Sequence, residues 1–356
     1  MITDSKTEKV TFQRKFKRFY QRSLLWLIAK FAPIKAIENP VDTPKNILIF
    51  VQEKMGDAIL MTPLIKNLKS VFPDILIHLV IFHKQSNIFN DDPNISQVHN
   101  FKKDKLSVAR TLKKLEFDVL YNTKDHPSFT FVILSRYLNA KYKVSIDHIF
   151  HRKHYHHLLS ADSMDHTIEK ICAVFSIWNI SKDKLQLQPY MPPMPVSDEV
   201  LEFTENLADQ TYIGINLSAG SPEKEWPVDK WNELVNQSNK QFIVFAVGEN
   251  LPAKVALEAD HENILKSPET KNINEAAAIV QKLKMLVTPS TGLMHVASCF
   301  DIPVVGLYRQ DLADHLRFAP YCRYYEKVIA DNHEVSNLSV IEVNTAIDSL
   351  SKIHGN

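Results

Sequence analysis

Two turns in the chain carry residue types that are able to bind an anion or to accept a proton. The later one, Pro289-Ser290-Thr291-Gly292, separates a strand predicted at 285–288 from a helix predicted at 293–299. The free N–H groups at the start of a helix attract anions, and glycine lets a ligand approach the backbone closely. The two hydroxyl groups can bind the same anion or cap the helix. The turn is therefore a candidate phosphate site, although an ordinary strand–helix turn has a similar composition.

The earlier turn, Glu53-Lys54-Met55-Gly56-Asp57, has the same setting. It follows an apolar strand predicted at 46–52 and precedes a helix predicted at 58–71. A carboxylate at the start of a helix, facing a cleft, can take the proton of a substrate hydroxyl as general base. Asp57 is equally suited to cap the helix.

The elements around these turns alternate between apolar strands and amphipathic helices. Further strands are predicted at 75–82, 117–121, 142–146, 212–216, 241–247 and 304–308, and a further helix is predicted at 165–178. Strands that are apolar throughout and alternate with helices indicate parallel sheets covered on both faces. The proline-rich segment 188–197 divides the chain into two such halves, which predicts an α/β fold of two Rossmann-like domains with a ligand cleft between them.

Composition excludes several classes of protein. The chain has 356 residues, 45% of them hydrophobic, and a net charge of +1, which fits about two domains and disfavours nucleic-acid binding. Cys172, Cys299 and Cys322 lie far apart without a CxxC pair, so we expect a reducing compartment and no zinc site. No apolar run is long enough to span a bilayer. We therefore predict a soluble cytoplasmic protein.

Residues 9–35 depart from this neutrality. The segment holds eight basic residues and an aromatic and aliphatic face at helical spacing, in which Phe12, Phe16, Phe19, Leu27 and Phe31 recur. Such a helix can lie on an anionic membrane, or it can pack its apolar face on the protein.

The segment His148–His157 is rich in histidine and basic residues. It lacks the carboxylate or cysteine ligands at a recognised spacing that a metal site would need. We interpret it as an inert loop, or else as a basic loop that meets an anionic acceptor.

Three motifs resemble glycosyltransferase family 9, the lipopolysaccharide heptosyltransferases. They are ILIFVQEKMGDAILMTPLIKNLKSVFPD (47–74), IGINLSAGSPEKEWPVDKWNEL (213–234) and VTPSTGLMHVASCFDIPVVGLY (287–308), and the likeness extends over about residues 46–335. It implies a GT-B fold, two Rossmann-like domains with parallel sheets facing a central cleft. The expected limits are a basic N-terminal helix and linker at 1–44, an acceptor domain at 45–190, a nucleotide-sugar domain at 198–335 and a C-terminal helix at 336–356.

The resemblance also implies roles for single residues. Asp57 matches the family's proposed general base, and Lys54, Met55 and Gly56 lie on the acceptor side. On the donor side it implies that Lys224 is the cation for the phosphates and that the backbone of Thr291, Gly292 and Leu293 forms a cradle for the pyrophosphate. It also implies that Glu249 contacts the ribose and that His295 and Gly220 are neighbouring donor-side residues. Many members carry Asp immediately before the Thr-Gly pair, whereas this chain has Ser290. That departure concerns the donor sugar more than the phosphates.

The function implied is inverting, metal-independent and cofactor-free transfer of heptose from ADP-heptose to the lipid A–core acceptor. The place expected is the cytoplasmic face of the inner membrane, with the anionic membrane surface as a partner and no nucleic acid. Alternatives are another nucleotide-sugar donor, such as a hexose or N-acetylhexosamine, a nucleotide-sugar epimerase of the same fold, and a non-catalytic protein of envelope assembly.

Overall fold

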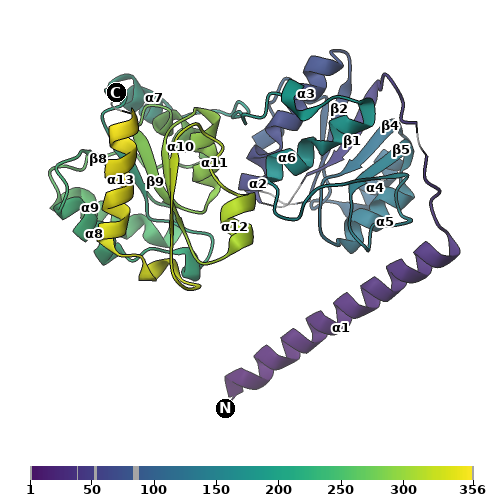
Figure 1. The fold of residues 1–356 in the computed structure, drawn as a ribbon, viewed down its shortest axis with the longest axis horizontal. Coiled ribbons are helices and arrows are strands. Elements are labelled where there is room, and N and C mark those ends of the chain that lie inside the picture. The colour runs from purple at the N-terminus through teal and green to yellow at the C-terminus, as the bar shows by residue number, and fades with distance from the viewer. Residues whose placement is uncertain (1, 38, 52–53, 83–87, 355–356) are drawn as a thin grey trace. The chain divides into compact units, whose positions relative to one another are not determined.

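The computed structural model describes residues 2–37, 39–51, 54–82 and 88–354, and within these ranges the side chains of residues 16 to 353. Contacts divide the chain into two compact units. The first consists of Met1–Glu53, Ile65–Ser163 and Lys170–Leu185, and the second of Lys54–Leu64, Met164–Glu169 and Gln186–Asn356. Both units combine a parallel sheet with flanking helices (Figure 1), so the α/β prediction is confirmed.

The first unit is built on a six-stranded sheet in the order β3-β2-β1-β4-β5-β6, with all its strand pairs parallel. Its strands are β1 (Asn46–Phe50), β2 (Leu76–Ile81), β3 (Gln97–Asn100), β4 (Glu116–Asn122), β5 (Asn139–Ile146) and β6 (His157–Leu159). The helices α4 (Lys105–Lys113) and α5 (Phe129–Tyr137) belong to this unit, while α3 (Thr62–Val71) and α6 (Thr167–Cys172) cross its limits. The strand order is that of a Rossmann sheet, which reverses direction between β1 and β4.

The second unit has a five-stranded parallel sheet in the order β11-β10-β9-β7-β8. Its strands are β7 (Ile213–Asn216), β8 (Phe242–Phe245), β9 (Met285–Pro289), β10 (Val304–Tyr308) and β11 (Tyr325–Ile329). Its helices are α2 (Met55–Ile59), α7 (Asp198–Glu205), α8 (Val228–Asn236), α9 (Leu251–Asp260), α10 (Ile273–Val280), α11 (Gly292–Cys299), α12 (Leu312–Arg317) and α13 (Val340–His354). Here the order reverses between β7 and β9, so ligands are expected beyond the carboxyl ends of these two strands.

The core of the second unit joins the sheet to helices on its flank. Buried Trp226 and Trp231 pack edge to face, with ring centroids 4.6 Å apart, in a cluster that includes Ile215, Val287 and Leu350. Trp226 also donates a hydrogen bond of 3.0 Å to the carbonyl of Leu338, before α13. This packing fixes the sheet and therefore the turns that follow β7 and β9.

Two predicted helices are wrong in their limits. The helix expected at 58–71 is two helices, α2 and α3, because Pro63 lacks an N–H and favours the first turn of a new helix. The helix expected at 165–178 is α6 followed by a 3₁₀ segment, Ala173–Trp178. The strand expected at 46–52 ends at Phe50, and Gln52 and Glu53 lie outside the described residues.

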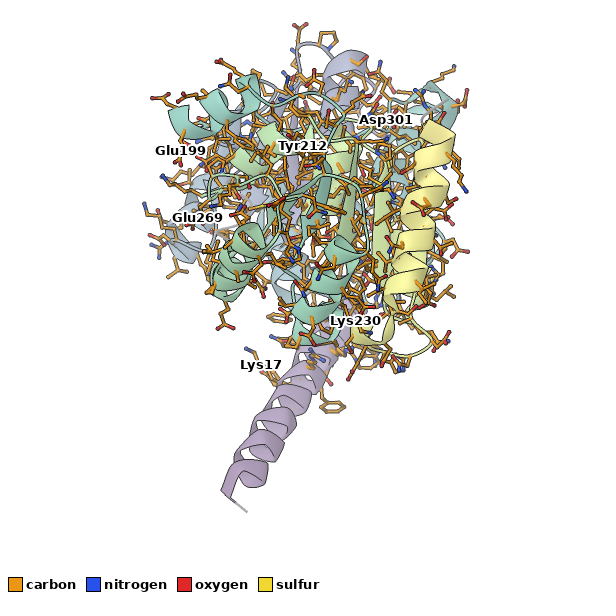
Figure 2. All side chains as sticks on the ribbon, turned by 90° about the vertical axis from the view of Figure 1, so that its left-hand side faces the viewer. Lys17, Glu199, Tyr212, Lys230, Glu269 and Asp301 are labelled. Atoms are coloured by element: carbon orange, nitrogen blue, oxygen red, sulfur yellow. The ribbon has the colours of Figure 1, made fainter. Side chains whose placement is uncertain are left out.

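The N-terminal helix α1 (Ile2–Phe31) presents two different faces. Leu25 is only 2% exposed and packs with Val132 and Tyr155 of the first unit. The opposite face carries exposed aromatic and aliphatic side chains, the aromatic stripe, formed by Phe16, Phe19, Tyr20, Trp26, Leu27 and Phe31. Lys17 projects from the same helix (Figure 2). Leu25 and Arg22, whose guanidinium carbon lies 5.1 Å from the ring centre of Phe150, therefore contact the rest of the unit on the side away from the aromatic stripe.

Candidate functional site

Hydrogen bonds tie together the strand ends at the point where the second sheet reverses its order. The side-chain amide of Asn216, at the end of β7, donates to the hydroxyl oxygens of Thr288 at 2.9 Å and Thr291 at 3.2 Å. Because the Thr291 hydroxyl is engaged there, its side chain makes no capping hydrogen bond to α11. The turn before α11 thus keeps a fixed shape while the backbone N–H groups that follow receive no side-chain cap from Thr291, as an anion site requires.

The first turn of α2 packs against the first turn of α11. A Cβ atom added to Gly56 would lie 2.9 Å from His295 Cδ2 and 3.5 Å from the Cα of Gly292. Real Cβ atoms do not approach that closely, so glycine at position 56 permits the contact. The predicted acceptor-side turn and the predicted donor cradle therefore meet inside one unit.

Asp57 occupies the first turn of α2, and Lys54 is the N-cap residue. The alternative that Asp57 caps a helix starting at 58 is therefore wrong. A carboxylate in the first turn is still stabilised by the helix dipole. Asp57 is half-buried, like Met55 and Gly56, whereas Lys54 is exposed.

His295, the α11 residue that Gly56 approaches, is a neutral side chain. It is 5% exposed. Burial, with smaller effects from His166 and Lys224, lowers the pKa of His295 to about 3. Its Nδ1 atom is buried and has no hydrogen-bond partner among the residues that the structure describes. His166, whose Nε2 lies 3.0 Å from the carbonyl oxygen of Ala319, is a neighbour that the sequence analysis missed.

An ion pair lies beside the predicted donor turn, residues 290–293. Lys224 Nζ lies 2.7 Å from Asp314 Oδ2, and Ser290 Oγ donates a 3.1 Å hydrogen bond to Asp314 Oδ1. Lys224 is held by the short 3₁₀ segment Pro222–Lys224, and Asp314 by the first turn of α12, where Asp311 is the N-cap. The structure therefore brings the predicted Lys224 and Ser290 together through a carboxylate that the sequence analysis did not single out.

Gly220 and Glu249 are not drawn into this network. Gly220 is exposed, and a Cβ atom there would meet no described atom within 4 Å, so no close contact with the described part of the chain requires glycine. Glu249 is also exposed, in the segment Gly248–Asn250 that follows β8. Its position beyond a strand end is compatible with the expected ribose contact, which stays a prediction.

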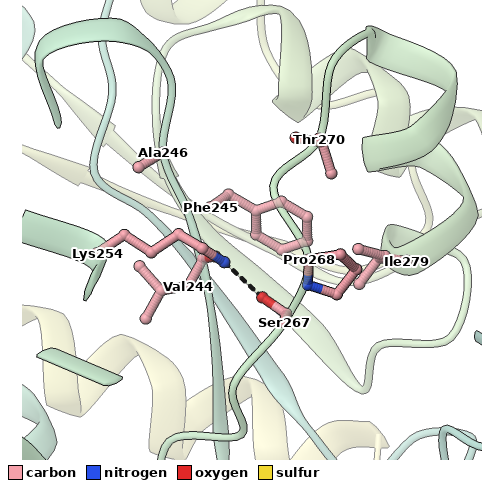
Figure 3. Close-up of a pocket in the computed structure, with 8 residues that line it drawn as sticks. All are labelled: Val244, Phe245, Ala246, Lys254, Ser267, Pro268, Thr270 and Ile279. Carbon is pink, nitrogen blue, oxygen red and sulfur yellow. Dashed lines mark hydrogen bonds between the residues drawn. The ribbon is translucent and has the colours of Figure 1, made fainter. Parts of the chain in front are cut away.

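A small pocket opens at the carboxyl end of β8 (Figure 3). Its lining comes from β8, α9, α10 and the loop 267–270, with Lys254 as the charged member. Lys254 Nζ donates to Ser267 Oγ at 2.6 Å and to the Val244 carbonyl at 3.0 Å, and it pairs with Glu258 at 2.9 Å. This lysine is consequently a structural cation that holds the loop against the strand.

In the first unit, charged residues gather beyond the end of β4. Buried Lys170 pairs with Asp125 at 3.1 Å, and buried Lys124 lies with its Nζ 4.5 Å from the ring centre of Phe131. His126 follows and is exposed. These residues were not predicted, because nothing in their local sequence distinguishes them from a surface turn.

The histidine-rich segment is largely structural. His151 is fully buried, with Nδ1 3.0 Å from Ser145 Oγ and 2.9 Å from the Ile146 carbonyl oxygen. His154 is also buried, with Nδ1 3.4 Å from an Arg136 nitrogen. Within the described ranges, no group of three His, Cys, Asp or Glu side chains is arranged to hold a metal ion. The same ranges contain no helix with the length and apolar character needed to cross a membrane.

The buried histidines predict a loss of stability in mild acid. Burial lowers the pKa of His151 to about 4 and that of His295 to about 3. The folded pKa values lie below the unfolded value near 6.5, so the stabilisation is complete above that pH and declines as pH falls below it. Each histidine should cost about 2 kcal/mol of unfolding free energy at pH 5 relative to pH 7.5. Urea denaturation at the two pH values measures this loss, and equal midpoints would contradict it.

The sequence and the fold were compared with those of known proteins. The profile of glycosyltransferase family 9 (heptosyltransferase) matches residues 105–344. The chain is 22% identical to the lipopolysaccharide core heptosyltransferase OpsX of Haemophilus influenzae over 299 residues, which cover 79% of this chain and 83% of that protein.

Two solved structures share the fold. The crystal structure of a family 9 glycosyltransferase from Veillonella parvula matches with a TM-score of 0.69 and 20% identity, over 88% of this chain and 98% of that one. The E. coli heptosyltransferase WaaC with ADP matches with a TM-score of 0.66 and 17% identity, over 85% and 99%. These likenesses confirm the predicted GT-B fold class. Because the family profile spans more than half of the chain's 356 residues, the chain belongs to glycosyltransferase family 9 and is a glycosyltransferase.

Proposed function

We propose that the protein transfers heptose from ADP-heptose to the core of lipopolysaccharide, with inversion at the sugar carbon and without a bound metal. Asp57 takes the proton of an acceptor hydroxyl while that oxygen attacks C1 of the sugar. The bond between C1 and the diphosphate oxygen breaks, and ADP leaves with its new charge facing Lys224 and the start of α11. The lipid A–core precursor is the acceptor.

The observation that carries this proposal is the contact between α2 and α11. Gly56 lies against Gly292 and His295, so the turn with Asp57 and the anion-binding turn belong to one compact unit. A base and a leaving-group site must be held in register during a displacement reaction. A contact that depends on glycine supplies that register.

The donor and acceptor are supported by relatives. OpsX is a lipopolysaccharide core heptosyltransferase, and the WaaC structure was determined with ADP.

A panel of nucleotide-sugars tests the proposal directly. A donor present at 100 times its Kd stabilises a protein by about 2.7 kcal/mol, which a thermal-shift assay detects. ADP-heptose should raise the melting temperature and then support transfer to a heptose-acceptor precursor. A shift with a UDP-hexose alone would favour the other-donor alternative. Conversion of the sugar without acceptor would favour an epimerase, and binding without turnover would favour a non-catalytic protein.

Lys224→Ala is expected to weaken ADP binding. A hydrogen bond to a charged group contributes about 1.5–3 kcal/mol, so Kd should rise by about 10- to 100-fold in calorimetry. Lys230→Ala is the matched control. Lys230 Nζ donates to the carbonyls of Ser336 and Leu338 in the same unit, so its loss should leave ADP affinity unchanged. An unchanged Kd in Lys224→Ala would remove this lysine from the donor site.

We also propose that α1 attaches the protein reversibly to the cytoplasmic face of the inner membrane. The aromatic stripe is exposed while the opposite face of the helix packs on the first unit through Leu25. Exposed Lys17 and Lys30 accompany the stripe, and Lys30 Nζ lies 5.1 Å from the ring centre of Trp26 and 5.5 Å from that of Phe31. Apolar side chains beside basic ones match an anionic bilayer surface, where the acceptor lipid resides.

A further inference from the structure

The carboxylate of Asp314 lies beside the turn 290–293, which has no charged side chain of its own. Position 290 is serine, yet its hydroxyl donates to Asp314 Oδ1 at 3.1 Å. The other oxygen of the same carboxylate accepts from Lys224 Nζ at 2.7 Å. The negative charge at the donor turn therefore comes from α12, 24 residues further along the chain.

The position of this carboxylate is set by its surroundings. Asp311, the N-cap of α12, accepts the backbone N–H of Asp314 at 3.3 Å, and a carboxylate in the first turn of a helix is stabilised by the dipole. The Asp314 side chain is 10% exposed, next to the half-buried residues of the turn. A carboxylate buried to this degree is held where Ser290 and Lys224 place it.

The pair offers different groups to different parts of a ligand. An ammonium has three donors, so Lys224 can keep one on Asp314 and give the others to a diphosphate. A carboxylate has about four acceptor sites, of which Ser290 and Lys224 use two. The remaining acceptor sites of the carboxylate therefore suit ligand groups that donate hydrogen bonds, such as the hydroxyl groups of a sugar.

The negative charge of Asp314 also favours a ligand that carries a sugar. The free nucleoside diphosphate carries an additional ionisable oxygen at the place where the sugar is attached in the nucleotide-sugar. A fixed carboxylate next to this place repels the free diphosphate more strongly than the sugar diester. We propose that Asp314 is a specificity-determining residue that makes the donor turn prefer the intact nucleotide-sugar to the free nucleoside diphosphate. The proposal rests on the function proposed above, because it takes the 290–293 turn as the donor site.

The test compares the affinities of ADP and ADP-heptose for the full-length protein by calorimetry. In Asp314→Asn the ratio of the two Kd values should shift by about tenfold or more in favour of ADP, since the loss of one charged hydrogen bond has that size. Adding Ser290→Asp to Asp314→Asn returns a carboxylate to the same turn and should restore most of the preference. Ser290→Ala, which removes only the hydroxyl that orients Asp314, should weaken the preference and keep the ion pair.

Glu275→Gln is the matched control. Glu275 is a buried carboxylate of the same unit that accepts from the backbone of Ser197 and Lys271, so the variant loses a carboxylate away from the turn. Its ratio of affinities should equal that of the wild type even if its melting temperature falls.

The outcomes separate the two proposals. Wild-type protein that prefers ADP-heptose, together with Asp314→Asn and Ser290→Ala variants that keep the full preference, would overturn the role of Asp314 alone. A double variant no more selective than Asp314→Asn would also overturn it, because the carboxylate would then not act at the turn. Wild-type protein that binds neither ligand would overturn the proposed function and this assignment with it.

Discussion

Asp57→Asn should lower the turnover of heptosyl transfer by about 10²- to 10⁴-fold, the usual contribution of a general base, while ADP affinity stays near the wild-type value. Asparagine keeps the shape of the side chain and removes its basicity. Asp57 lies in the first turn of α2, and the neighbouring Gly56 makes the contact with α11. The substitution at position 57 therefore leaves the donor turn in place. Steady-state transfer assays and calorimetry with ADP measure the two effects separately.

The effect of a base must be distinguished from that of a helix charge. An acidic residue in the first turn stabilises a helix by about 0.3–1 kcal/mol through the dipole, and Asp57→Asn loses this as well. Asp229→Asn is the matched control, because Asp229 is the exposed acidic residue in the first turn of α8. It should lose similar stability and no turnover. If Asp57→Asn retained turnover close to that of Asp229→Asn, Asp57 would serve only its helix.

The strands were predictable because their signal is local. Each central strand is a run of apolar residues, such as Met285–Thr288, and a strand covered on both faces needs no partner to be recognised. Short edge strands escaped prediction: β3 has the sequence QVHN and β6 has HLL. The order of the strands was also beyond reach, since it depends on which crossover packs on which face.

The residues of the candidate site likewise divide into those with a local sequence signal and those that only the fold brings together. Ser290, Thr291, Gly292 and Asp57 were found because small and polar residues directly follow a strand. Asp314 was missed because its partners, Lys224 and Ser290, lie 90 and 24 residues away, and no local pattern marks a carboxylate that reaches back to another turn. Asn216 was missed for the same reason, as its amide meets Thr291 75 residues later. The packing of α2 on α11 likewise appears only in three dimensions.

The structure also determines how the membrane proposal should be tested. Deletion of residues 1–35 would remove Leu25 from its packing with Val132 and Tyr155, and it would remove the Ala32 carbonyl that accepts from Arg136. Loss of binding in that deletion would then be confused with damage to the first unit. Substitutions confined to the aromatic stripe avoid this problem.

We expect the triple variant Phe19→Ser, Trp26→Ser and Phe31→Ser to lose most of its binding to anionic vesicles. These side chains are 70%, 59% and 75% exposed, so they are available for insertion and their removal leaves the packed face intact. Partial burial of each in the interface contributes on the order of 1 kcal/mol, so the partition coefficient should fall by about 100-fold. Co-sedimentation with vesicles that contain phosphatidylglycerol measures this fall.

The control for this variant carries the same number of apolar-to-serine substitutions elsewhere. Leu106→Ser, Ile149→Ser and Ile341→Ser replace residues that are 68%, 67% and 74% exposed, and this protein should sediment like the wild type. Wild-type binding should weaken in high salt and on vesicles of phosphatidylcholine alone, because each basic residue near an anionic surface contributes about 1 kcal/mol that salt screens. Retention of the stripe variant at the wild-type level would show that α1 does not bind the bilayer through these aromatic residues. Loss in both triple variants would show that the assay reports general surface hydrophobicity, because only a loss confined to the stripe variant matches a helix that inserts one face.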